Sequence, residues 1–214
     1  MLRSLDRLVD RLTELGAAAL VVVEVALLFT GVISRYVFGW PLVWVEELAG
    51  ILFLWLVSLG AVIALSRGEH MRMTVIATRL PPAAQRVAGR FAALVVAVVA
   101  VGLVVPGLDY AAQQVAILTP VMQIPGSWEI GGQLFALILM FYVAIRRLFD
   151  DTTWRELAAV VGVTVVIGLA LWALEPAFDA LANADLLIFF IGIVGVCILI
   201  GVPIAFSFGI ATFA

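Results

Sequence analysis

Few residues of this sequence could do chemistry, and the most unusual of them is Glu24. It lies nine residues into an apolar stretch that begins at Leu15, which is about 13 Å along a helix axis at about 1.5 Å per residue. An acid so deep in an apolar segment is a candidate functional residue. It could relay a proton or cation, or it could form a buried hydrogen bond or ion pair between two helices. We favour the structural interpretation, because a relay needs a chain of groups and no other acid lies deep in a complete apolar segment.

A second group of charges lies around the break between the first two apolar segments. Arg35 comes before the break, and Glu46 and Glu47 follow it, with Trp44 beside them. These residues could form a docking surface or a structural clamp against a partner. They could also be ordinary solvated charges with tryptophans at a membrane interface, and composition alone favours that second interpretation.

The next break, a cytoplasmic turn, contains Glu69, His70 and Arg72, and His70 is expected to be a surface or capping residue and not a ligand. His70 is the only histidine and Cys197 the only cysteine. A bis-histidine haem, an intrachain disulfide and a cysteine-based metal site are therefore excluded by counting. The sequence also has no paired acid and base, no nucleophile constellation and no nucleotide-binding glycine loop. We expect no cofactor in this chain, no enzymatic activity and no nucleic-acid partner.

The elements that carry these residues are predicted to be membrane-spanning helices. Hydrophobic residues make up 65% of the 214 and charged residues 13%, against about 45–50% and about 25% in soluble domains. A span needs about 20 mostly apolar residues, and the sequence offers five such stretches before a broken sixth. The five are residues 15–36, 45–65, 91–105 within a helix-compatible range of 83–118, 130–145 and 157–174. The predicted fold class is an all-α integral membrane protein.

Proline, glycine and leucine refine these boundaries. Pro81-Pro82 can open the third helix, and Pro106-Gly107 should kink or end its membrane-embedded part. Gly201-Val202-Pro203 interrupts the uncharged residues 186–214, although a single tilted helix is an alternative there. Leucines at helical spacing in residues 2–15 suit either a short helix on the membrane surface or a plain extension of the first span.

The distribution of arginine predicts the topology. Eleven of the twelve arginines fall on one side if successive spans alternate, and only Arg35 falls on the other. Since basic residues concentrate in cytoplasmic loops, the N-terminus and residues 66–90 should be cytoplasmic. Residues 37–44, 119–128 and 175–185 should be periplasmic, and the protein should lie in a bacterial inner membrane.

The motifs at the breaks between the apolar stretches resemble those of one transporter family. Arg35-Tyr36-Val37-Phe38, followed by Trp44-Val45-Glu46-Glu47, is similar to the signature of small membrane subunits of tripartite ATP-independent periplasmic (TRAP) transporters. Further matches follow in the family's order over residues 1–150. They are Gly68-Glu69-His70-Met71-Arg72, Leu80-Pro81-Pro82, Thr119-Pro120, Ile124-Pro125 and Trp128.

The rest of the chain resembles a junction to the large membrane subunit. The expected domains are a four-helix small-subunit unit (1–150), a connecting transmembrane helix with its loop (151–183), and the first helix or two of a larger transport domain (184–214). The last rests on Gly201-Val202-Pro203-Ile204-Ala205-Phe206, which looks like a large-subunit start. We expect the working protein to continue beyond Ala214 or to receive this part from another chain.

The resemblance implies a scaffold in a secondary transporter that imports an organic acid. Its partners would be the large membrane subunit, a periplasmic substrate-binding protein and the lipid bilayer. Na⁺ would bind in the large subunit and drive uptake there. The alternative is a non-catalytic anchoring or assembly subunit of another inner-membrane complex.

Overall fold

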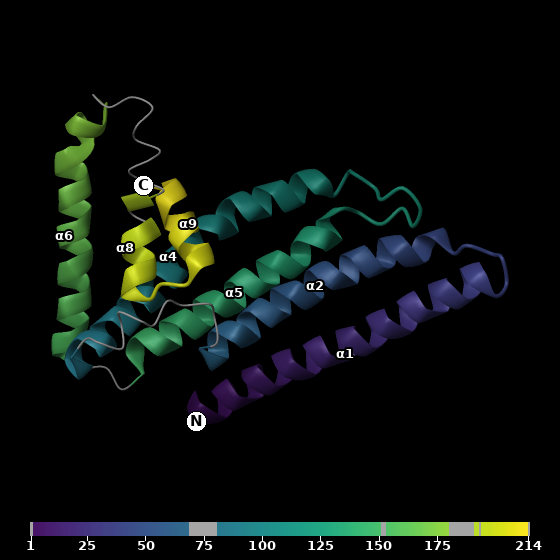
Figure 1. Ribbon diagram of the computed structural model, residues 1–214, viewed down its shortest axis with the longest axis horizontal. Helices are drawn as coiled ribbons and strands as arrows, with labels where there is room; N and C mark the ends of the chain where they lie inside the picture. The colour runs from purple at the N-terminus through teal and green to yellow at the C-terminus, as the bar shows by residue number, and fades with distance from the viewer. Residues whose placement is uncertain (1, 69–80, 151–152, 180–190, 193, 214) are drawn as a thin grey trace. The chain divides into compact units, whose positions relative to one another are not determined.

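The computed structural model describes residues 2–68, 81–150, 153–179, 191–192 and 194–213, and their regular elements are all helices (Figure 1). The helices are α1 (Leu2–Tyr36), α2 (Val43–Arg67), α4 (Pro82–Gln114), α5 (Ser127–Phe149), α6 (Trp154–Asp179), α8 (Val194–Ile200) and α9 (Ile204–Phe213). By length and composition, α1, α2, α4 and α5 can each cross a membrane. The all-α membrane fold and its first four spans are confirmed. Helix α6 forms where the fifth span was predicted, but its crossing of the membrane stays a prediction.

Two compact units divide the chain. Unit 1 comprises Met1–Glu69 and Val101–Met140, and unit 2 comprises His70–Ala100 and Phe141–Ala214. Helices α4 and α5 each contribute one part to either unit. The predicted boundary near residue 150, between small-subunit and connecting segments, is a division by family resemblance and stays a prediction.

Unit 1 is built on the packing of α1 against α2, which lie side by side (Figure 1). The buried and half-buried positions of α1 recur every three or four residues, as a helix–helix seam requires. Thr13, Ala17, Leu20, Glu24, Leu27 and Gly31 are among them. A side chain at Gly31 would come within 2.9 Å of Val45 Cγ1, so glycine permits the close approach of the two helices.

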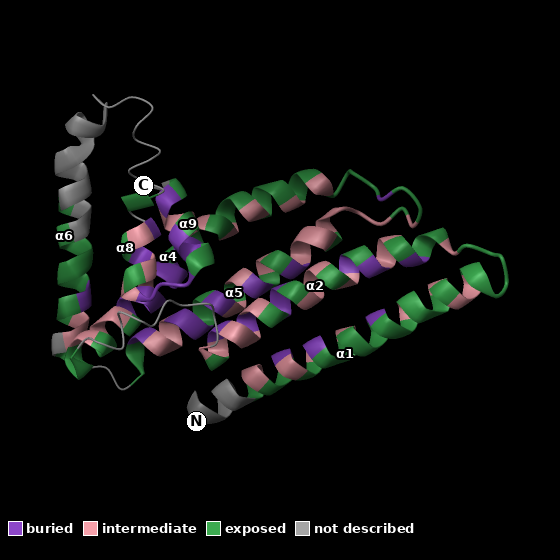
Figure 2. Cartoon of the chain, in the orientation of Figure 1, coloured by how far each residue is buried: buried purple, intermediate pink, exposed green. Residues whose placement is uncertain are grey.

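Most of the remaining circumference of α1 is exposed (Figure 2), and between Leu15 and Val32 its exposed side chains are almost all apolar. Val22, Val25 and Phe29 are among the side chains that face outward there. A helix that is apolar all round belongs in a membrane or inside a large core. Only 6% of the most apolar stretch of α1 is buried. This exposure indicates contact with lipid or with another membrane chain.

Unit 2 places the first part of α4 at its centre. Residues 90–97 of α4 are nearly all buried, and Ala100 is fully buried. Helix α9 approaches this part of α4 closely, because a side chain at Gly209 would lie 3.0 Å from Val99 Cγ1. Val202 and Ser207 are also completely buried, so the segment around α9 is a packed part of unit 2.

The structure decides three of the boundary predictions. Helix α4 begins at Pro82 as predicted and runs through Pro106 to Gln114, so the helix itself does not end at Pro106, and a kink or an end of the membrane-embedded part there stays a prediction. Helix α1 is continuous from Leu2, which favours the plain extension over a separate surface helix. The chain breaks at Gly201, with φ of 97°, and α8 packs against α9. A single tilted helix over residues 186–214 is therefore wrong.

Candidate functional site

The α1–α2 turn carries an ion pair that the two helix ends bring together. The Arg35 guanidinium, in the last turn of α1, bonds the Glu46 carboxylate in the first turn of α2. Between them Gly39 takes a left-handed conformation with φ of 66°, and the Trp40 N–H donates to Ser34 O at 3.0 Å. The two charged side chains remain 50% and 65% exposed, so this pair is accessible at the surface.

Glu47 has a different role from its neighbour Glu46. Its carboxylate accepts the backbone N–H of Val121 at 2.8 Å and that of Met122 at 2.9 Å. These donors lie in the loop of residues 115–126 between α4 and α5. One charged side chain thus fixes the loop to α2 through two charge-assisted hydrogen bonds, which are stronger than neutral ones.

The 115–126 loop has an internal structure that presents these donors. Thr119 N–H donates to Ile124 O at 2.9 Å, and the Thr119 hydroxyl accepts the Ile124 N–H at 3.0 Å. Gln123 adopts a positive φ of 55°, and its amide donates to the carbonyls of Thr119 and Pro120 at 3.1 and 3.2 Å. The tight turn leaves two successive N–H groups pointing at Glu47. We call Arg35, Glu46, Glu47 and this loop the turn-end cluster.

Trp55 joins α2 to α5 next to the turn-end cluster. Its indole N–H donates to Trp128 O at 2.8 Å, and its ring lies 6.3 Å from that of Phe135. A side chain at Gly132 would meet Trp55 Cγ at 2.9 Å and the Trp55 backbone Cα at 3.1 Å. Only a residue without a side chain allows α5 to pass Trp55 so closely.

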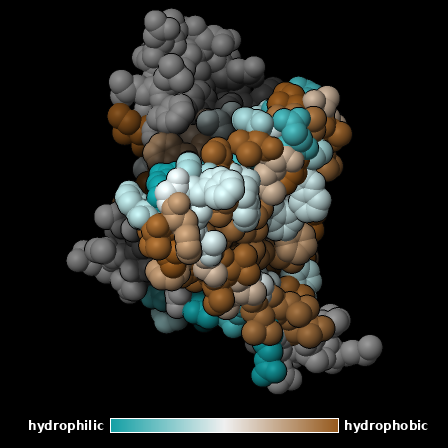
Figure 3. Space-filling model, turned by 90° about the vertical axis from the view of Figure 1, so that its right-hand side faces the viewer, coloured by the Kyte–Doolittle hydropathy of each residue, from teal (hydrophilic) through white to brown (hydrophobic). Residues whose placement is uncertain are grey.

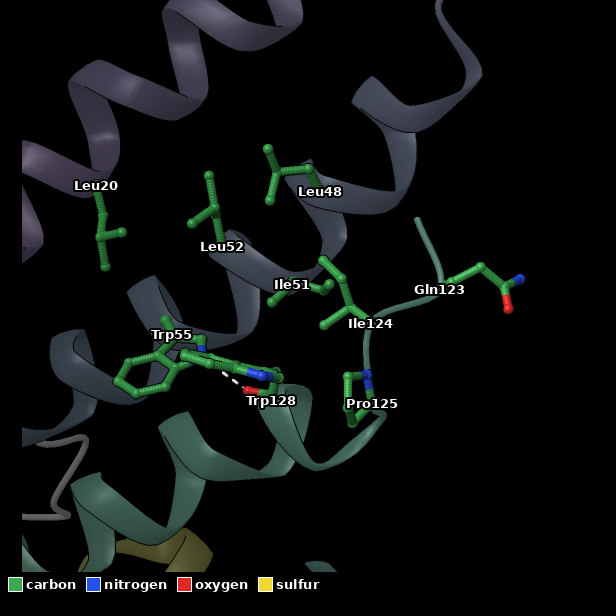
Figure 4. A pocket seen from close by; sticks show the side chains of 9 residues that line it. All are labelled: Leu20, Leu48, Ile51, Leu52, Trp55, Gln123, Ile124, Pro125 and Trp128. Atoms are coloured by element: carbon green, nitrogen blue, oxygen red, sulfur yellow. Dashed lines mark hydrogen bonds between the residues drawn. The ribbon is translucent and has the colours of Figure 1, made fainter. Parts of the chain in front are cut away.

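An apolar groove of about 590 Å³ runs beside Trp55 between α1, α2 and the 115–126 loop (Figure 4). Its volume lies within the range of small-molecule sites, about 300–1,000 Å³. Apolar side chains form its walls, and Gln123 points away from it (Figure 4). The lining residues are Leu20, Leu48, Ile51, Leu52, Trp55, Gln123, Ile124, Pro125 and Trp128.

Aromatic and aliphatic side chains surround the turn-end cluster. Tyr36, Phe38 and Trp40 are 74–80% exposed, and Trp44 is 39% exposed. Figure 3, which faces this end of unit 1, shows many hydrophobic and weakly polar atoms and few strongly hydrophilic ones. Aromatic rings are typical of the boundary between lipid and water, so this end suits a position at a membrane interface.

Glu24 lies in the α1–α2 seam. Its side chain is buried, with 9% of the residue exposed. Its Oε2 atom is buried without a hydrogen-bond partner among the residues that the structure describes. The predicted internal pair is thus not formed within that part of the chain.

Ion pairs at other helix ends were missed from the sequence. Arg67 of α2 bonds Glu14 of α1 at 2.8 Å, at the far end of the seam. In unit 2, Glu156 is bonded by Arg86 at 2.7 Å and by Arg90. It also accepts the Thr153 N–H at 3.2 Å, which is the glutamate half of a capping box at the start of α6.

The environment of Glu156 favours its charged form. The hydrogen bond from Arg86, followed by that from the Thr153 N–H, lowers the pKa of Glu156 from 4.5 to about 2. Glu156 therefore stays ionised at neutral pH and ties the first turn of α6 to α4. The sequence signal that could have shown this was Thr153-x-x-Glu156 at a helix start.

Three predicted residues, Glu69, His70 and Arg72, lie outside the residues that the structure describes. Within the described part, no group of three or more His, Cys, Asp or Glu side chains could hold a metal ion. The geometry instead offers a rigid, partly charged surface and an apolar groove. Such an arrangement can bind a partner or a lipid chain.

Comparison with known families decides the identity of the chain. Residues 24–153, more than half of the sequence, match the family described as tripartite ATP-independent periplasmic transporters, DctQ component. The chain belongs to this family. The DctQ chain is thus a component of a transporter and a multi-pass membrane protein, which confirms the recognition of a TRAP small subunit. The family match also confirms that the chain is a transporter component and not an enzyme. The alternative of an anchoring subunit in an unrelated complex is therefore removed.

Individual relatives of the DctQ chain agree with this assignment. A TRAP transporter small permease protein of Haemophilus influenzae is 33% identical over 87 residues, which are 41% of this chain and 54% of the relative. The sialic acid TRAP transporter small permease protein SiaQ of Vibrio cholerae is 24% identical over 155 residues, 70% of this chain and 86% of SiaQ. The sialic acid TRAP transporter permease protein SiaT of Haemophilus influenzae is 30% identical over 88 residues, 41% of this chain but 14% of SiaT. The chain thus spans about half the length of the first of these relatives.

Proposed function

We propose that this DctQ chain is the scaffold of a TRAP transporter that imports an organic acid delivered by a periplasmic binding protein. The observation that carries the proposal is the turn-end cluster. Glu47 fixes the 115–126 loop beside the exposed Arg35–Glu46 pair, so the surface is formed before any partner arrives. A preorganised surface binds with a smaller entropy cost than a mobile one.

The substrate class and the energy source follow from relatives and family. SiaQ and SiaT are named for sialic acid, which is a carboxylic acid, and this supports an organic acid as the cargo. Na⁺ coupling would reside in the large membrane subunit, as the resemblance to the family implies. The chain would then hold that subunit in the membrane and help to dock the binding protein.

The orientation proposed for the chain places the turn-end cluster in the periplasm. Eleven of twelve arginines lie on the predicted cytoplasmic side, in accord with the positive-inside rule. The ends of α1 and α2 that Arg67 and Glu14 join would then face the cytoplasm. Cysteine labelling in a Cys197→Ser background tests this. Trp40→Cys should react with an impermeant reagent in intact cells, and His70→Cys should not; the reverse pattern would refute the orientation.

We also propose that residues 184–214 begin a large-subunit domain and that residues 151–183 connect it to the small-subunit unit. The support is the Gly201-Val202-Pro203 break, where α8 and α9 pack against each other, together with the resemblance of this stretch to a large-subunit start. Intact mass of the native protein and identification of co-purifying chains test this. A native species of about 23 kDa without a large membrane partner would overturn it.

A charge-swap experiment tests docking at the turn-end cluster. Arg35→Glu combined with Glu46→Arg keeps an opposite-charge pair inside the chain but reverses the charges that a docking protein meets. Uptake by the reconstituted transporter should need a higher concentration of binding protein. The matched control is Glu14→Arg with Arg67→Glu at the far end of the seam, which should leave that dependence unchanged. Equal behaviour of the two swaps would refute docking at this surface.

A further inference from the structure

The carboxyl group of Glu24 is a buried polar group that the described chain leaves without a hydrogen-bond donor. The residue is 9% exposed, and its Oε2 atom has no hydrogen-bond partner among the residues that the structure describes. Buried polar groups in native proteins are nearly always hydrogen-bonded, and each exception needs an explanation. In lipid the need is greater, because no water is present to satisfy the group.

The polar side chains near this depth on α1 and α2 are already committed to other bonds. The Ser58 hydroxyl donates to Leu54 O at 2.6 Å. The Trp55 indole N–H donates to Trp128 O, a backbone carbonyl of α5. The Thr30 hydroxyl, on α1 itself, donates to Ala26 O at 2.7 Å. None of these three donors is available to Glu24 without breaking a bond that the chain already makes.

The surroundings of Glu24 allow a side chain from outside to reach it. Leu20, one turn before Glu24 on the same seam, lines the apolar groove between α1, α2 and the 115–126 loop (Figure 4). The outer face of α1 beside Glu24, including Val21 and Val25, is exposed and apolar. A second helix can therefore lie along α1. The last torsion of a glutamate is soft and roughly two-fold, so its two oxygens can exchange places to meet a donor.

We propose that Glu24 is a contact for a partner membrane chain, whose transmembrane helix supplies a basic or amide side chain at the depth of Glu24. The chemistry selects this partner: a carboxylate in lipid is matched by a side chain that donates hydrogen bonds and carries or tolerates positive charge. Such intramembrane acids pair with another polar group or line a water-filled cavity. The inference rests on the proposed function only in that the partner is taken to be a subunit of the same transporter.

Paired stability and assembly measurements test this contact. Glu24→Leu removes the carboxyl but keeps an apolar side chain that the seam can pack. The chain expressed alone should be as stable as wild type or more stable, because an unsatisfied polar group is removed. The complex with its membrane partner should weaken at least tenfold. Thr30→Val, which removes a hydroxyl already bonded within α1, is the matched control and should leave assembly unchanged.

Two outcomes would overturn the proposal. Equal destabilisation of the isolated chain and of the complex would assign the carboxyl to internal packing, and unchanged assembly would show that no partner uses it. If Glu24→Leu fails to insert, a photo-crosslinking residue at Leu20 in the otherwise native chain decides. Crosslinks to a second membrane chain support the contact, and crosslinks confined to lipid or to this chain refute it. A crosslink to a membrane chain that is not a transporter subunit would support the contact at Glu24 but overturn the proposed function.

Discussion

Substitution of Gly132 by alanine tests the closest approach of two helices in unit 1. The added methyl group would lie 2.9 Å from Trp55 Cγ and Cδ2 and 3.1 Å from the Trp55 backbone Cα. A flexible side chain could yield, but the α2 backbone cannot move without disturbing the α1–α2 seam. Overpacking of this kind costs about 1–3 kcal/mol. Alanine regains about 1 kcal/mol of helix propensity, so we expect a net loss of about 0–2 kcal/mol, with a midpoint of about 1 kcal/mol.

Two other glycines separate this backbone contact from ordinary crowding. A side chain at Gly107 would come still closer to a neighbour, 2.7 Å from Leu134 Cδ2, but that atom ends a flexible side chain. A side chain at Gly60 would meet nothing within 4 Å. We therefore expect Gly132→Ala to destabilise the chain most, Gly107→Ala less, and Gly60→Ala not at all.

Unfolding of the purified chain in lipid nanodiscs or mild detergent measures these differences. The free energy of unfolding can be obtained from denaturant titration followed by circular dichroism, which reports the loss of helix. If Gly107→Ala lowers the free energy of unfolding more than Gly132→Ala does, the distance to the nearest atom determines the loss of stability. The expectation that a backbone contact costs more than a side-chain contact is then wrong. If all three variants match wild type, α5 does not lie against Trp55 as the structure has it.

Three further predictions concern hydrogen bonds and charges. Trp55→Phe should cost about 0.5–1.5 kcal/mol of unfolding free energy for the lost indole hydrogen bond, and a loss near zero in denaturant titration would contradict that bond. Glu47→Gln should speed amide hydrogen exchange in the 115–126 loop, whereas Glu46→Gln should not; equal exchange rates in the two variants would count against the clamp. Because the pKa of Glu156 lies at about 2 instead of 4.5, its bonds stabilise unit 2 fully above about pH 4.5, and this contribution is lost as the pH falls toward 2. Stability measured across that range should lose part of its acid dependence in Glu156→Gln, and an unchanged profile would refute this role.

Several features of the fold could be read from short stretches of sequence. The four spans follow from runs of apolar residues, because partition into lipid depends on the composition of each segment by itself. The start of α4 at Pro82 and the break at Gly201-Val202-Pro203 follow from the backbone restrictions of proline and glycine. Pro106 shows the limit of this approach. Proline disfavours a helix interior, yet α4 continues through it, as membrane helices often tolerate.

The roles of the charged residues could not be read in the same way. Glu46 and Glu47 are neighbours in sequence, but successive side chains of a helix point about 100° apart. Glu47 binds the 115–126 loop, whose Val121 lies 74 residues away in sequence, whereas Glu46 forms a surface ion pair with Arg35. Only the position of that loop in the fold separates the two roles. Arg86, Arg90 and Glu156 likewise meet across 66 to 70 residues.

The sequence by itself determined that this protein is a bundle of membrane helices and, through its loop motifs, that it resembles TRAP small subunits. It also singled out Glu24 as an acidic residue inside a membrane-spanning segment. Only the tertiary structure decided that Glu24 faces α2 with no donor among the described residues, that Gly132 lets α5 approach Trp55, and that Glu47 fixes the 115–126 loop. The physical reason is range: helix formation and lipid burial depend on residues within a few turns, whereas hydrogen bonds between distant segments depend on how whole helices pack.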